Sequence, residues 1–116
     1  MPTAASVLVF GRDYQLVHTR SLILEKAGFH VRTASSLPDI QQLHSEPGVD
    51  VMVLCHSLST QECAAALTLT HERWPLIQTI ALVSGSSGCG TEAADTVMEA
   101  SEGPAKLISA VHRHLN

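Results

Sequence analysis

The stretch SVLVFGRD, residues 6–13, decides the fold, because a mostly apolar run ends abruptly at Gly11. A short apolar run of this kind predicts a strand that is buried on both faces. Asp13 follows at a position where its side chain can cap the first turn of a helix, and Gly28 is typical of the end of that helix. The apolar residues expected on the inner stripe of this helix are Leu16, Ile23, Leu24 and Ala27.

The same strand-then-helix unit recurs along the chain. Four more strands are expected, at residues 29–34, 50–55, 77–83 and, more weakly, 95–99. Helices are expected to begin at Ser36, at Ser59, where Ser59 and Glu62 fit a capping box, and at Pro104, while only a very short helix fits at 91–94. This strict alternation predicts one α/β domain, residues 1–116, with a doubly wound parallel sheet and a shortened fourth helix.

Composition excludes several classes of protein. The 116 residues are 45% hydrophobic and 16% charged, which suits a single packed domain, and the net charge of −4 argues against a nucleic-acid surface. No apolar run approaches the roughly 20 residues that cross a bilayer, and the N-terminus lacks the pattern of a signal peptide. Three cysteines, an odd number, make a disulfide framework unexpected, so we expect a cytoplasmic protein.

Function in such a sheet is expected beyond the carboxyl ends of the strands. The sequence places Arg12, Cys55, His56 and Ser84 there, together with a single carboxylate, Asp13, that is expected to cap a helix. Mg²⁺ prefers oxygen ligands, so this set predicts no metal site. No cofactor is expected either.

The whole chain resembles the receiver domain of two-component response regulators. Residues 7–10 resemble the first strand and residues 16–28 the first helix of that family. Residues 50–54 resemble the strand that leads to the phosphoacceptor, and residues 80–85 resemble the fourth strand with its hydroxyl residue. The resemblance implies a flavodoxin-like (βα)5 three-layer sandwich with strand order 2-1-3-4-5, and a role in two-component signal transduction and phosphorelay.

The departures from that family fall on the residues that carry its chemistry. Gly11 and Arg12 stand where receivers have a metal-binding acidic pair, Cys55 stands where they have the phosphorylated aspartate, and Ala100 replaces their lysine. Among the matched positions only Ser84 keeps the residue type. Aspartyl phosphorylation needs a carboxylate nucleophile and a divalent cation. We therefore interpret the chain as a pseudo-receiver, a non-enzymatic signalling and interaction module that acts independently of phosphorylation.

Two alternatives involve the same edge. Ser84 or Cys55 could accept a phosphoryl group or a small ligand, or Cys55 could act as a redox sensor if Arg12 lowers its pKa. Arg12 could instead serve as a fixed positive charge in the vacated metal pocket. The simpler interpretation of Cys55 is a small apolar residue at the end of a strand.

Two further hypotheses concern metal and partners. Cys55, His56, Cys63 and Cys89 carry zinc-type ligand atoms, but adjacent strand residues point to opposite faces, which disfavours joint ligation. The expected partner is a protein of a signalling pathway, or a second copy of the chain. The residues expected to offer an interaction surface are Val97, at the family's aromatic switch position, and, on the last helix, Leu107, Val111 and Leu115.

Overall fold

A computed structural model of the chain describes residues 5–43, 48–55, 58–84, 87–88 and 94–115. The strands in these ranges are β1 (Ser6–Phe10), β2 (His30–Ala34), β3 (Val51–Leu54), β4 (Gln78–Ser84), β5 (Ser87–Gly88) and β6 (Thr96–Glu99). The helices are α1 (Tyr14–Lys26), α2 (Leu37–Gln42), α3 (Thr60–Arg73) and α4 (Pro104–Leu115), with a 3₁₀ turn, η1, at Ala100–Glu102. No helix of the described chain has the length and apolar character needed to cross a bilayer.

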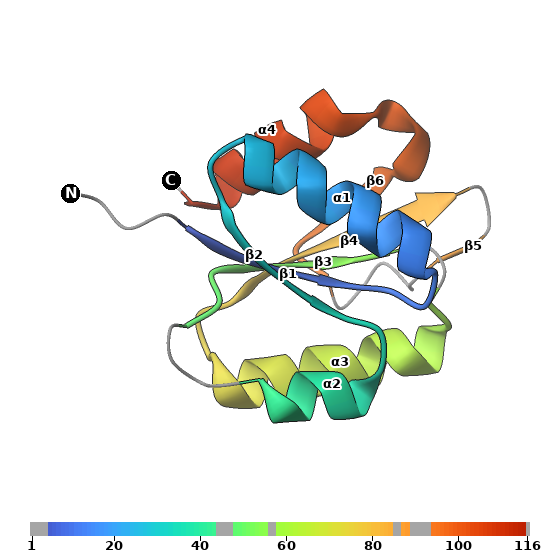
Figure 1. Ribbon diagram of the computed structural model, residues 1–116. Helices are drawn as coiled ribbons and strands as arrows, with labels where there is room; N and C mark the ends of the chain where they lie inside the picture. The colour runs from blue at the N-terminus through green and yellow to red at the C-terminus, as the bar shows by residue number, and fades with distance from the viewer. Residues whose placement is uncertain (1–4, 44–47, 56–57, 85–86, 89–93, 116) are drawn as a thin grey trace.

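Five strands form a parallel sheet in the order β2-β1-β3-β4-β6, which confirms the predicted order 2-1-3-4-5. Helices α1 and α4 cover one face of the sheet, and α2 and α3 cover the other (Figure 1). The short strand β5 was not predicted, and it pairs antiparallel with the end of β4 through Ser84 and Ser87. Residues 91–93 of the expected short helix lie outside the described residues, and Ala94 forms a bend.

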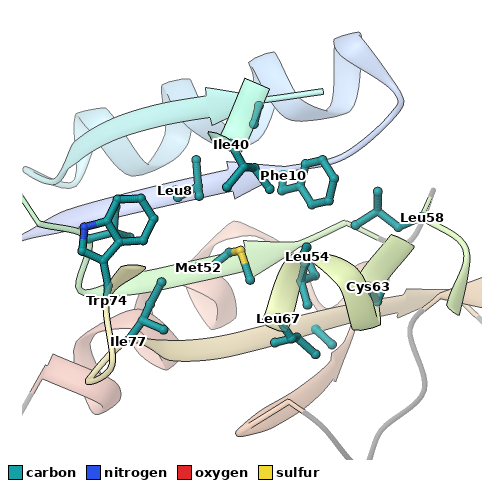
Figure 2. Packing of buried hydrophobic residues seen from close by; sticks show 14 residues of the cluster. Leu8, Phe10, Ile40, Met52, Leu54, Leu58, Cys63, Leu67, Trp74 and Ile77 are labelled. Carbon is teal, nitrogen blue, oxygen red and sulfur yellow. The ribbon is translucent and has the colours of Figure 1, made fainter. Parts of the chain in front are cut away.

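Alternation along the strands divides the core into two clusters. Leu8, Phe10, Met52 and Leu54 point toward α2 and α3, where Trp74 closes the cluster (Figure 2). The intervening residues of the same strands point toward α1 and α4: Val7, Val9, Val51, Val53 and Cys55. Because both faces are buried, the strands are continuously apolar, as the sequence predicted.

The helix termini follow the predicted capping pattern. Asp13 Oδ1 accepts the amides of Gln15 at 3.0 Å and Leu16 at 3.3 Å. The amide of Glu62 donates to Ser59 Oγ at 3.1 Å, and the Ser59 amide donates back to Glu62 Oε1 at 3.0 Å. These contacts satisfy amides that have no partner inside the helix, so both helices start where the sequence says.

The inner stripe of α1 differs from the prediction. Its buried residues are Val17, Ser21 and Leu24, whereas Leu16 and Ile23 are only half-buried. Ser21 can be buried because its hydroxyl donates to the carbonyl of His18 at 2.8 Å, within the helix itself. The stripe is therefore rotated, and Leu16 and Ile23 line a cavity together with Leu107 of α4.

Candidate functional site at the carboxyl ends of the strands

The ends of β1 and β3 meet where the phosphoacceptor of a receiver would lie. The Cys55 amide donates to the Phe10 carbonyl at 2.9 Å, which places Cys55 beside Gly11. A Cβ atom built on Gly11 would lie 2.7 Å from Cys55 Cβ, 2.9 Å from Cys55 Sγ and 3.0 Å from Val17 Cγ2. Contacts below 3.0 Å are essentially never made by real Cβ atoms. Position 11 therefore has no room for a side chain in this backbone.

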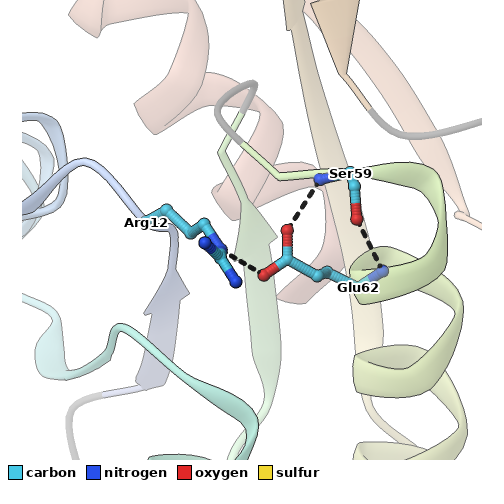
Figure 3. A network of polar contacts seen from close by, with 3 residues as sticks. All are labelled: Arg12, Ser59 and Glu62. Carbon is cyan, nitrogen blue, oxygen red and sulfur yellow. Dashed lines mark hydrogen bonds and ion pairs between the residues drawn. The ribbon is translucent and has the colours of Figure 1, made fainter.

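Arg12 is turned away from Cys55. Its side chain is 68% exposed, and its Nε forms an ion pair with Glu62 Oε2 at the start of α3 (Figure 3). The pKa of Glu62 is lowered, first by the hydrogen bond from the Ser59 amide and then by Arg12. Arg12 is not among the groups that shift the pKa of Cys55, so the hypothesis that it lowers this pKa finds no support, and the hypothesis of a fixed charge in the vacated pocket stays a prediction.

Arg20 of α1 is the cation that acts on Cys55, and no sequence pattern indicated this role. Burial raises the pKa of the Cys55 thiol, while the charge of Arg20 and a hydrogen bond from it act in the lowering direction. Asp13 adds a smaller raising effect. Since burial dominates, the thiol is held in its neutral form. The available signal was the position of Arg20 beside Ser21, at the border of the buried stripe of α1.

Ser84 and Ala100 complete the edge. Ser84 is the last residue of β4 and is exposed. The parallel register pairs Val83 with Glu99, and Ala100 follows directly in the turn η1, so Ser84 and Ala100 both lie at the carboxyl ends of their strands. The structure thus gathers Gly11, Cys55, Ser84 and Ala100 at one edge of the sheet, where the sequence placed them.

The hypothesis of a zinc site finds no support in the described part of the chain. Cys55 lies in the cluster under α1 and α4, and Cys63 lies in the cluster on the other face. Cys63 is disulfide-bonded, so its sulfur is not a thiolate ligand. His56 and Cys89 lie outside the described residues, within which no cluster of three ligand-type residues forms.

The expected interaction surface is largely internal. Leu107 is 4% exposed and Val111 fully buried, because both pack against the sheet beneath α4. Val97 and Leu115 are half-buried and pack against the two core clusters. Leu107 and Val111 are therefore part of the core and are not free to bind a partner.

Solved structures with this architecture are numerous. A receiver domain protein of Methanospirillum hungatei matches with a TM-score of 0.78 and 16% identity, over 97% of this chain and 94% of its own. A receiver domain protein of Clostridium thermocellum matches with a TM-score of 0.77 and 19% identity, over 97% and 94%. The chain has the fold of a response regulator receiver domain. No family model matches the sequence, and no curated protein is similar to it in sequence.

A third structure with the receiver fold provides a chemical contrast. It is a response regulator of Burkholderia pseudomallei that contains a phosphorylated aspartic acid and a calcium ion. Its TM-score is 0.72 at 15% identity, over 91% of this chain and 65% of its own. At identities this low the match concerns the fold alone.

Proposed function

We propose that this chain is a non-enzymatic, receiver-like signalling module that acts through protein–protein contacts and does not accept a phosphoryl group. The observation that carries the proposal is the contact between Gly11 and Cys55. A first metal-binding carboxylate would have to start from position 11, where even a Cβ atom collides with Cys55. The receiver fold supports a signalling role, and this contact supports a role without the chemistry of phosphorylation.

The other requirements of aspartyl phosphorylation fail one by one. The nucleophile position holds Cys55, a fully buried thiol whose pKa is raised. The second metal-binding position holds Arg12, which would repel a divalent cation and is paired with Glu62. The nearby carboxylate Asp13 is engaged in capping α1. Ala100 has no charge to offer a transferred phosphoryl group.

Two alternative functions each depend on one residue at this edge. Ser84 presents an exposed hydroxyl at the end of β4, which keeps phosphoryl acceptance by serine as the second candidate. A redox sensor at Cys55 is the weaker candidate, because reactive cysteines are partly exposed and have a lowered pKa. Burial of this thiol works in the opposite direction on both counts.

The partner in this proposal is a protein, either of a signalling pathway or a second copy of the chain. Light scattering tests the second case directly. A cytoplasmic location stays a prediction.

The test is incubation with acetyl phosphate and Mg²⁺, followed by intact-mass measurement, with the Methanospirillum receiver domain treated in parallel. We expect no mass gain in this chain. A stable gain of one phosphoryl group would overturn the proposal. Its loss in Ser84→Ala, but not in Cys55→Ala, would establish the serine alternative.

A further inference from the structure

A cavity of about 190 Å³ lies between α1 and α4, at the carboxyl ends of β4 and β6. Its apolar wall is contributed by four elements, through the side chains of Leu16, Ile23, Leu82, Met98 and Leu107. Leu16 and Ile23 of α1 form part of this wall, together with Leu107 of α4. Ligands of open α/β sheets bind at this end of the strands, so the cavity has the position of a binding site.

One cation stands in this apolar surrounding. Arg20 lines the cavity and its Nη1 nitrogen is buried, while its guanidinium also reaches the thiol of Cys55. A guanidinium carries five N–H donors, so it can bind more than one acceptor at the same time. A ligand bound to Arg20 would therefore be adjacent to the position that phosphorylation uses in receivers.

A negative charge, that of Glu99, lies at the opening of the cavity. Glu99 also lines the cavity, but its side chain is exposed, and its backbone amide donates to Glu102 Oε2 at 3.1 Å in the turn η1. Water screens an exposed charge more than a buried one. The field inside the cavity is therefore set mainly by Arg20, and Glu99 weakens the attraction of an anion without reversing it.

The volume limits the size of the ligand. Since a water molecule occupies about 30 Å³ of liquid, the cavity corresponds to roughly six waters, which suits a ligand of about six to nine non-hydrogen atoms. From its apolar wall, the half-buried guanidinium of Arg20 in its lining and its volume, we propose that this cavity binds a small monocarboxylate with an apolar body. The carboxylate would pair with Arg20, and the hydrocarbon chain would lie between Ile23, Met98 and Leu107. This site goes beyond the proposed function and does not depend on it.

The test is titration of the full chain with hexanoate, followed by ¹H–¹⁵N correlation spectra. We expect saturable shifts at the amides of Thr19, Leu82 and Gly103, which line the cavity, and none at Gln41 and Thr68, which line a separate groove between α2 and α3. Hexan-1-ol tests the need for the charge, and acetate tests the need for the apolar body. Both should bind at least about tenfold more weakly than hexanoate.

Charge variants identify the residues. Arg20→Gln should weaken hexanoate binding by about tenfold to a hundredfold, as expected for loss of a charge-assisted hydrogen bond. Glu99→Gln should strengthen binding severalfold, because it removes the opposing charge. Arg12→Gln is the matched control, since it removes an exposed guanidinium outside the cavity and should leave affinity unchanged.

A filling variant covers the case in which Arg20→Gln does not fold. Ala100 lines the cavity, and Ala100→Met should occupy it and abolish binding while the spectrum of the fold is retained. The proposal is overturned if hexan-1-ol binds as well as hexanoate, or if Arg12→Gln and Arg20→Gln weaken binding equally. It is also overturned if the shifts fall outside the residues that line the cavity.

Discussion

The two ends of the parallel strands, called edges here, differ in their acidic residues. At the edge where β3 and β6 begin, two carboxylates tie neighbouring strands together. Asp50 Oδ2 accepts the Ser6 amide at 2.8 Å, and Asp95 Oδ2 accepts the Thr79 amide at 2.8 Å and the Thr79 hydroxyl at 3.0 Å. At the edge where β1 and β3 end, the residues are Gly11 and Cys55, and a Cβ atom at Gly11 would collide with the side chain of Cys55.

This difference separates the residues that hold the fold from those that would perform its chemistry. The carboxylates that satisfy strand amides are present, because unsatisfied buried amides cost stability. The positions that the proposal compares with metal-binding carboxylates hold Gly11, packed against Cys55, and Arg12, paired with Glu62. The comparison therefore predicts effects of different size at the two edges.

The largest effect is expected at Gly11. Gly11→Asp should destabilise the chain by at least about 3 kcal/mol, because it adds a steric clash and buries a carboxylate. Urea denaturation measures the change. Gly48→Ala is the control, because a Cβ there would lie an ordinary 3.7 Å from Trp74 Cδ1. A Gly11→Asp variant of unchanged stability would contradict the packing account of this edge.

A smaller effect is expected at the opposite edge. Asp95→Ala should cost about 1–2 kcal/mol, because it leaves the Thr79 amide and hydroxyl without their acceptor. Asp95→Asn should cost less, since its amide oxygen can still accept. Thermal unfolding measures both variants, and Glu25→Gln on the exposed side of α1 is the control. Equal losses for Asp95→Ala and Glu25→Gln would show that these carboxylates do not hold the strands together.

The smallest effect concerns the surface carboxylates Glu62 and Asp39. Both pKa values are lowered in the folded chain, Glu62 first by the Ser59 amide and Asp39 first by the Ser35 amide. A lowered folded-state pKa contributes stability that is present above the ordinary carboxyl pKa of about 4 and is lost as pH falls through the folded value. Stability should therefore fall on acidification below about pH 4.

Two variants test how much Glu62 and its ion pair contribute to this loss of stability at low pH. Glu62→Gln should flatten the loss of stability below pH 4, whereas Arg12→Gln should change stability by no more than about 1 kcal/mol, as for other exposed ion pairs. Urea midpoints measured between pH 3 and 7 test both. A slope that is identical in Glu62→Gln and the parent chain would show that Glu62 contributes nothing to it.

Much of the fold could be predicted from the sequence because the residues that determine it act locally. The apolar runs, the capping residues Asp13, Ser59 and Glu62, and Gly28, which adopts a φ of 101°, act within a few residues of the chain. For the candidate site, the sequence predicted which residues lie at the ends of the strands, but not which side chains contact one another. The contact of Arg20 with Cys55 depends on how α1 is oriented against the sheet, and the buried face of α1 includes the polar residue Ser21, which hydrophobic periodicity does not predict.

The hydrogen-bond partners of the acidic residues could not be predicted from the sequence either. The sequence places Asp50 and Asp95 next to strands, but which backbone amide each accepts depends on the register between strands distant in the chain. The exposure of Leu107 and Val111 was misjudged for a related reason. One apolar stripe on α4 serves either as a core face or as a partner surface, and only the packing of α4 on the sheet decides between them.

The central claim is that no divalent cation binds where β1 and β3 end. Its most direct test is a Mg²⁺ titration of the full chain followed by ¹H–¹⁵N correlation spectra. The account predicts no saturable shift of the amides of Gly11, Arg12 and Cys55 at millimolar Mg²⁺. Saturable shifts confined to these three amides would contradict it, because they would place a divalent cation where the structure leaves room for no carboxylate.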